Sequence, residues 1–199
     1  ASGLPGRLDD VYYYRSPSDL PAYVTVSYRP KDRENRDAIL VKGGASWDNW
    51  NLSVTHTELE QGVTSEVAGG GSIEIDSHTA QIASLYYRND VYAIGFGVQR
   101  ELDAMGVESN DRTSLVLDGS RVLSDRSRFR ALLANTRGRG ADSNAIMWAL
   151  GYDYFLSDQL TVYADVGAVY NEANASFSVN SKGHGEGAAP LPGEDPYVA

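Results

Sequence analysis

The chain has 199 residues and a formal net charge of −10, from 17 Lys and Arg against 27 Asp and Glu. This acidic balance excludes a general nucleic-acid binder, which needs a basic face to neutralise phosphates. The absence of cysteine excludes disulfide scaffolds, zinc–thiolate sites and thiol catalysis. With 13 Tyr and 20 Gly, the composition favours an all-β protein, with residues 1–199 as a single domain.

Apolar and polar residues alternate with period two along most of the chain, which predicts about ten β-strands. In residues 22–29, for example, Val24 and Tyr28 share one face, whereas Thr25 and Arg29 share the other. The predicted strands are residues 7–15, 22–29, 37–46, 50–58, 79–88, 91–100, 113–123, 128–137, 144–155 and 160–171. The last residues, 197–199, resemble the start of a further strand.

One run is ambiguous between strand and helix. In residues 128–135 (RFRALLAN), Phe129, Leu132 and Leu133 also have helical spacing, and Ser127 would serve as an N-cap. We interpret the run as a strand because the strands predicted on both sides of it have matching lengths. A short amphipathic helix is the alternative.

Short and long connections alternate along the chain. The short ones contain turn residues such as Ser-Pro, Asp-Asn and Asn-Asp, whereas most of the others are longer and are Gly-rich or charged. The short connections are residues 16–21, 47–49, 89–90, 124–127 and 156–159, and the others are 30–36, 60–78, 101–112, 138–143 and 172–196. This alternation predicts an antiparallel up-and-down meander with its tight turns at one end.

Strand length and charge favour a transmembrane β-barrel over a soluble sheet with one solvated face. Strands of roughly 9–12 residues can cross a bilayer at a tilt. Charged side chains opposite an apolar face must meet water, so an apolar face in lipid implies an aqueous lumen and a closed sheet. The predicted pore-lining residues are Arg7, Asp9, Arg15, Arg29, Lys42, Arg128, Arg130 and Asp165. Aromatic residues at strand ends suit interfacial girdles: Tyr12, Tyr14, Tyr28, Trp47, Trp50, Tyr86, Tyr92, Tyr152 and Tyr154.

Two segments resemble Gram-negative trimeric general porins. Residues 7–28 (RLDDVYYYRSPSDLPAYVTVSY) resemble the porin stretch in which a strand that begins with Arg ends in Ser-Pro before a tight turn. Residues 149–171 (ALGYDYFLSDQLTVYADVGAVYN) look like the penultimate porin hairpin, with its Gly-Tyr-Asp-Tyr and its Leu-Ser turn. The rest of the chain resembles these porins in the alternation of strands and connections, but it contains no distinctive motif.

The resemblance implies an outer-membrane barrel of sixteen strands, of which this chain would supply strands six to fifteen as an incomplete barrel. A complete smaller barrel is the alternative. The first five strands, the inward-folded constriction loop and the closing strand would lie outside the chain. Arg7, which would follow that loop, is expected to be part of the basic wall of the pore.

The function implied by the resemblance is passive diffusion of ions and small hydrophilic solutes across the bacterial outer membrane. Implied partners are outer-membrane lipid, lipopolysaccharide and two further copies in a homotrimer, with no cofactor, no metal and no enzymatic activity. The histidines show no metal-ligand spacing, and Gly69–Gly71 lacks the Lys and Ser/Thr of a phosphate loop.

Two other functions are kept open. One is a substrate-specific porin for anions, which a ladder of basic residues on adjacent strands would favour. The other is a soluble β-sandwich module that binds carbohydrate, which solubility without detergent would favour. An alternative interpretation of the charges on the polar face is that they keep a wide lumen hydrated without affecting selectivity.

Overall fold

The structure is a computed structural model that describes residues 11–17, 19–31, 37–60, 77–103, 111–179 and 190–198, together with the backbone of 64–67 and 71–74. The strands are β1 (Tyr12–Arg15), β2 (Ala22–Arg29), β3 (Ala38–Trp47), β4 (Trp50–Glu60), β5 (Thr64–Val67), β6 (Gly71–Glu74), β7 (Ser77–Arg88), β8 (Tyr92–Leu102), β9 (Arg112–Ser124), β10 (Ser127–Gly138), β11 (Ala145–Ser157), β12 (Leu160–Asn171) and β13 (Tyr197–Val198). In these ranges there is no helix with the length and apolarity needed to cross a bilayer.

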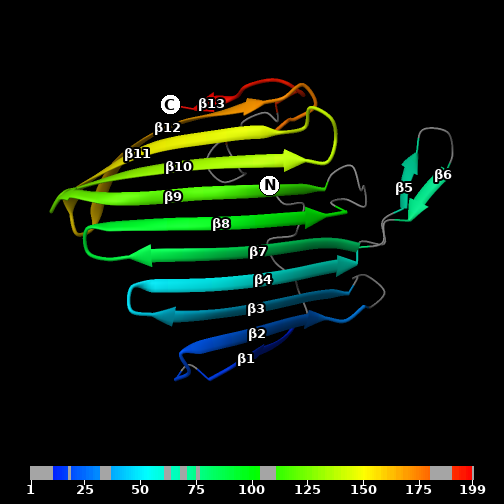
Figure 1. Cartoon of the computed structure of the whole chain (residues 1–199), viewed down its shortest axis with the longest axis horizontal. Coiled ribbons are helices and arrows are strands. Elements are labelled where there is room, and N and C mark those ends of the chain that lie inside the picture. Colours follow the sequence, from blue (N-terminus) through cyan, green and yellow to red (C-terminus); the bar gives the residue numbers. More distant parts are fainter. Residues whose placement is uncertain are drawn as a thin grey trace. The chain divides into compact units, whose positions relative to one another are not determined.

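The strands form an antiparallel up-and-down meander, as predicted. Hydrogen bonding orders the 11-stranded sheet as β1-β2-β3-β4-β7-β8-β9-β10-β11-β12-β13, so neighbouring strands follow one another along the chain except at β4 and β7, between which β5 and β6 are inserted (Figure 1). Strands β5 and β6 pair with each other in a separate hairpin, in a segment for which a loop was predicted. The ambiguous run at 128–135 belongs to β10, so its interpretation as a strand is confirmed.

The chain divides into two compact units. The first contains residues 1–84 and 99–113, and the second contains residues 85–98 and 114–199. Each unit is described below by itself.

In the first unit, strand register separates a polar face from an apolar one. Arg15 pairs with Thr25, Thr25 with Lys42, and Lys42 with Thr55, so these four side chains form one row on one face of the sheet. Alternation puts Arg29 on the same face. The opposite face carries exposed apolar side chains: Tyr12, Tyr14, Val24, Tyr28, Ile39, Trp47, Trp50, Leu52 and Val54.

The second unit has the same two faces, and β10–β12 show them most clearly. From the turn end, the rows of the polar face are Arg128–Asp153–Tyr163, Arg130–Gly151–Asp165, Leu132–Ala149–Gly167, Ala134–Met147–Val169 and Thr136–Ala145–Asn171. The other face carries exposed large apolar side chains: Phe129, Leu133, Ile146, Leu150, Tyr152, Tyr154, Val162, Val166 and Tyr170.

Burial in this sheet is the reverse of that in a water-soluble domain. Among the described residues, the buried hydrophobic side chains are five alanines and Val169, whereas more than thirty large hydrophobic residues are exposed. Isolated exposed apolar side chains are ordinary, but the rows of large apolar side chains on one face of each unit need an apolar surrounding. Each unit therefore presents one apolar face of the kind that the strands of an outer-membrane barrel turn toward lipid.

The tight turns use the chemistry predicted for them. Trp47 pairs with Trp50 across a two-residue turn in which Asp48 has a φ of 46°. The Oδ1 atom of Asn89 accepts hydrogen bonds from the backbone N–H groups of Val91 (2.9 Å) and Tyr92 (2.8 Å). The Asn89 side chain thus supplies hydrogen-bond partners for backbone groups at the turn, directly before and at the start of β8.

One predicted girdle residue lies on the other face. Tyr86 lines a cavity together with Arg130 and Asp165, which lie on the polar face of the second unit, so Tyr86 points to that side. Its neighbour Tyr87 is the one that stacks on Tyr92, with ring centroids 5.7 Å apart. Sequence composition did not distinguish these adjacent tyrosines, because both suit a strand end.

Candidate functional site

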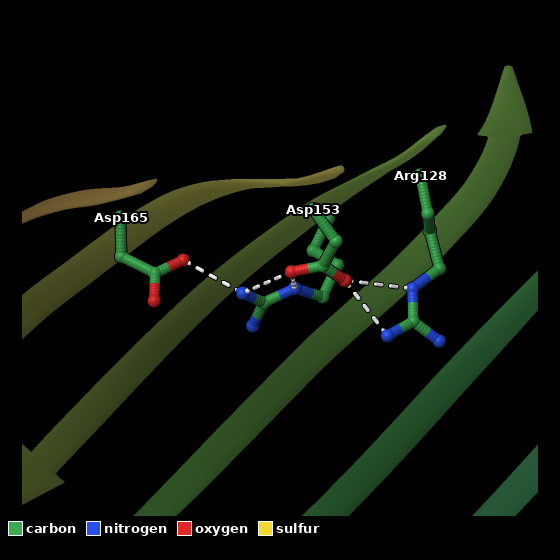
Figure 2. A network of polar contacts seen from close by, with 4 residues as sticks. Arg128, Asp153 and Asp165 are labelled. Carbon is green, nitrogen blue, oxygen red and sulfur yellow. Dashed lines mark hydrogen bonds and ion pairs between the residues drawn. The ribbon is translucent and has the colours of Figure 1, made fainter. Parts of the chain in front are cut away.

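Four charged residues on the polar face of β10–β12 form a continuous ion-pair cluster. Arg128 and Arg130 alternate on β10, Asp153 lies on β11 and Asp165 lies on β12. Figure 2 shows Asp153 beside Arg128, and Asp165 at the other end of the chain of contacts. We call these four residues the ion-pair cluster.

Asp153 is the centre of the cluster. Its Oδ2 accepts a hydrogen bond from Arg128 Nε at 2.9 Å and lies 2.7 Å from Arg128 Nη2. Its Oδ1 accepts from Arg130 Nε at 3.1 Å and from Arg130 Nη2 at 2.9 Å. Each arginine therefore presents two nitrogen atoms to one carboxylate, a geometry that strengthens a charged hydrogen bond and fixes its direction.

Arg130 extends the cluster across a second strand. Its Nη2 also donates to Asp165 Oδ1 at 2.8 Å, although β11 lies between β10 and β12. The register explains the reach, because Gly151 is the residue opposite both Arg130 and Asp165. A Cβ atom at Gly151 would lie 3.0 Å from Cζ and Nη2 of Arg130, so the missing side chain lets the ion pair pass directly over the β11 backbone.

Burial differs strongly within the cluster. The side chain of Asp153 is 5% exposed, whereas those of Arg128, Arg130 and Asp165 are 40–44% exposed. Asp153 therefore needs both arginines to offset its desolvation, while the arginines keep a side open to water. The guanidinium groups and the carboxylate of Asp165 are therefore the parts of the cluster that stay open to solvent.

We predict that Gly151→Ala separates Arg130 from Asp165. The cost to the free energy of unfolding should be about 1 kcal/mol, because the new Cβ meets the ends of two flexible side chains, so the cost is mainly the loss of a partly exposed ion pair. Urea unfolding of the refolded full-length protein measures it. Gly43→Ala is the matched control, since a Cβ there meets only Tyr23 O, at 3.8 Å; equal costs at the two glycines would contradict the prediction.

The structure brings some of the predicted pore-lining residues together and leaves others apart. Arg128, Arg130 and Asp165 form one cluster in the second unit. Arg15 and Lys42 share one row of the first unit, and Arg29 is on the same face. Arg7 and Asp9 lie outside the described residues.

Lys42 has an aromatic neighbour as well. Its Nζ lies 6.0 Å from the centroid of the Tyr23 ring, within reach of a cation–π interaction. That ring lies over Gly44, where a Cβ would come within 2.6 Å of ring carbons. In both units, therefore, a glycine in the polar face lets a neighbouring side chain cross its strand.

The sequence reasoning missed Asp153, the most buried member of the cluster. In the run GYDYF, Asp153 lies between Tyr152 and Tyr154, and period two puts it on the face opposite both tyrosines. That alternation was the available signal.

Asp118 was also missed. It lines a cavity of about 510 Å³ on the polar face together with Arg130, Asp165 and Tyr86. A Cβ on Gly95 would lie 3.0 Å from the carboxyl carbon of Asp118, so a glycine again makes room for a wall charge. This acid adds a negative charge beside the ion-pair cluster.

A second buried polar group lies in the first unit. Glu101 is 1% exposed and forms an ion pair with Arg112, and Gln99 donates a hydrogen bond to the same carboxylate. His78 is fully buried and interacts electrostatically with both Glu101 and Arg112. Glu101 and Arg112 were predicted in a loop, but β8 extends through Leu102 and β9 begins at Arg112, so the pair closes the ends of these strands.

Metal ligation has no candidate in the described ranges, where no three His, Asp or Glu residues gather as a metal site would require. Many of the acidic loop residues, including Asp76, Glu108 and Glu186, lie outside the described residues.

A family model described as Gram-negative porin matches residues 2–174. No curated protein gives a significant match. Among solved structures, the anion-selective porin from Comamonas acidovorans is similar, with a TM-score of 0.75 and 14% identity over 94% of this chain and 56% of that chain.

OmpT, an outer membrane protein of Vibrio cholerae, is similar as well. Its loop L8 deletion mutant has a TM-score of 0.63 and 20% identity, covering 82% of this chain and 60% of that chain. The outer-membrane expressed OmpT has a TM-score of 0.60 and 19% identity, covering 80% and 53%. The chain thus spans little more than half the length of the solved structures it matches, and these likenesses support the fold.

Proposed function

The chain belongs to the Gram-negative porin family, and on that premise we propose that it forms part of a channel for the passive diffusion of ions and small hydrophilic solutes. The family places it in the bacterial outer membrane. One observation carries the proposal: in each unit the strands carry exposed large apolar side chains on one face and charged side chains on the other. In lipid, such a sheet separates hydrocarbon from water.

The mechanism we propose is size selection combined with the electrostatics of the wall. A hydrated ion loses little of its hydration in a wide lumen, so charges on the wall change its local concentration rather than bind it. The pore-lining residues would be Arg7, Asp9, Arg15, Arg29, Lys42, Arg128, Arg130 and Asp165, to which the geometry adds Asp118, while the buried Asp153 holds Arg128 and Arg130 in place. No step of this mechanism forms or breaks a covalent bond, so we propose a channel and not an enzyme.

The whole protein is proposed to be larger than this chain. We propose a sixteen-stranded barrel in which the 199 residues supply strands six to fifteen as one β-barrel domain, assembled as a homotrimer in contact with lipopolysaccharide. The coverage of 53–60% of the matched structures is compatible with a part of this size. Chemical crosslinking of the protein in native membranes tests the trimer.

Planar-bilayer recording of the full-length protein tests the channel itself. Stepwise ohmic currents, with a reversal potential close to zero in a salt gradient, are expected for a general-diffusion porin. Absence of current from correctly folded protein would contradict the proposed function.

An anion-selective channel is the second candidate. It is favoured by a group of basic residues in the first unit, because Arg15, Arg29 and Lys42 lie on one face of three adjacent strands. The structurally similar porin from Comamonas acidovorans is anion-selective, which agrees with this candidate. The ion-pair cluster argues for the general porin, since its two arginines are balanced by two aspartates.

The pair of substitutions Arg15→Gln and Lys42→Gln distinguishes these candidates. If the row that contains Arg15 and Lys42 attracts anions, the reversal potential of the double variant in a tenfold KCl gradient should move toward cation preference by about 10 mV. An ideally selective pore would give ~59 mV in the same gradient. Lys31→Gln is the control: it removes the same type of charge from a residue outside the strands, bound to Glu60 at 2.8 Å. An unchanged potential in the double variant would favour the general porin.

A further inference from the structure

The residues that follow β12 fold back onto the sheet. Ala175 is 2% exposed and packs against Ala145 and Val169, which are also buried. Phe177 and Val179 add partly buried apolar side chains to the same cluster. The first part of this long connection is therefore packed against the strands.

The face that this segment covers is the polar one. Val169 alternates with Gly167 and Asp165 along β12, so all three point to the same side. The segment thus lies on the side of the ion-pair cluster, opposite the exposed apolar face. Val179 also lines the cavity to which Arg130 and Asp165 belong.

Hydrogen bonds hold the segment in this position. Asn171 Nδ2 donates to Phe177 O at 2.9 Å, and Phe177 N–H donates to Asn171 Oδ1 at 3.0 Å, so one side chain satisfies both backbone groups. Asn174 Nδ2 donates to Ala141 O at 2.9 Å, and Gly193 N–H donates to Ala175 O. The segment is consequently tied at its start, at its middle and to the returning chain.

The polar face of β10–β12 has an apolar area at the place where the segment packs. Toward the turn end the polar face carries charges, but toward the loop end its rows contain Ala134, Met147, Val169 and Ala145. Apolar side chains on a water-facing wall are unfavourable unless something covers them. Residues 175–179 supply that cover, which explains why the wall changes from charged to apolar along these strands.

We propose that residues 172–179 narrow the channel from inside, and that Phe177 and Val179 form an apolar rim that sets its size limit beside the ion-pair cluster. The inference rests on the proposed channel function. Hydrated solutes would be excluded from the apolar rim and directed along Arg128, Arg130 and Asp165. Solute size would then be limited by the segment, and ion preference by the wall.

Modification of an introduced cysteine tests this proposal, because the 199 residues contain no cysteine of their own, and the unsubstituted full-length protein treated with the same reagent accounts for any cysteine outside them. Full-length protein carrying Val179→Cys is reconstituted in planar bilayers and exposed to a positively charged, water-soluble methanethiosulfonate reagent. We expect a stepwise fall in conductance of about one third per modified channel, because the adduct fills part of the narrow passage. Leu191→Cys is the matched control: it is an apolar residue of the same connection, 66% exposed, and should leave the conductance nearly unchanged.

A second measurement uses size selection. Phe177→Ala with Val179→Ala should increase the rate at which liposomes swell in large neutral sugars more than in small ones, since both side chains of the rim are shortened. Equal acceleration for all sugars, or none, would overturn the proposal.

The outcomes distinguish a failure of this proposal from a failure of the proposed channel function. Unmodified full-length protein without channel activity overturns the proposed function. If the protein conducts, and mass spectrometry verifies that V179C is modified, an unchanged conductance overturns the proposal that this segment narrows the channel. The proposed channel function is then unaffected. Failure of V179C to react overturns the narrowing too, because the proposal requires this side chain to meet the aqueous passage.

Discussion

Asp153→Asn is expected to lower the free energy of unfolding by about 2–3 kcal/mol, because it removes a buried charge that accepts hydrogen bonds from two arginines. The carboxylate is 5% exposed and holds both guanidinium groups in place. Without it, Arg128 and Arg130 repel each other and lose their common acceptor. Urea unfolding of the full-length protein in lipid vesicles measures the change.

Asp165→Asn is the matched control for this prediction. It removes the same charge from the same cluster, but Asp165 is 44% exposed and accepts one hydrogen bond, from Arg130. Its loss should cost about 0–1 kcal/mol, as for an exposed ion pair. Because both substitutions make the wall more positive, both should move the reversal potential toward anions. Equal losses of stability would show that the burial of Asp153 does not matter to the fold.

Leu133→Lys is expected to destabilise the folded protein in a bilayer by about 2–4 kcal/mol, the cost of a basic residue on a lipid face near the midplane. Leu133 is 52% exposed on the apolar face and lies near the middle of the 12-residue strand β10. The measurement is vesicle-based unfolding, together with the yield of folded protein in the membrane.

The adjacent residue provides a control at the same depth. Leu132 points to the opposite face and lines the cavity on that face, so Leu132→Lys places its charge on the side of the ion-pair cluster. We expect it to cost about 1 kcal/mol or less, for the loss of partial packing. If the two lysine variants were equally stable, the assignment of the two faces to lipid and water would be wrong.

Much of the fold could be predicted from local sequence, because a strand that separates two different surroundings must alternate with period two. Val24 and Tyr28 against Thr25 and Arg29 already define the two faces of β2, and the structure confirms them. Turn residues such as Asn89 mark strand ends because their side chains bond locally to the backbone. The family resemblance from residues 7–28 and 149–171 agrees with the matched family model.

The candidate site could be predicted in part. Arg128, Arg130 and Asp165 were identified as wall residues from their face alone, but their joint contact with Asp153 depends on strand register. Register is a relation between strands, and hydrophobic alternation within one strand does not specify it. Gly151 shows the same limit, because its role follows from being opposite Arg130 and Asp165 together.

The sequence alone therefore determined the strand pattern, the two faces and the class of protein, since each of these depends on residues close together in the chain. Tertiary structure decided which wall charges meet, which of them is buried, that Tyr86 faces the polar side, and that residues 172–179 cover Met147 and Val169. These features depend on contacts between strands and on the return of a long connection. Their energies come from packing and desolvation, which no single segment contains.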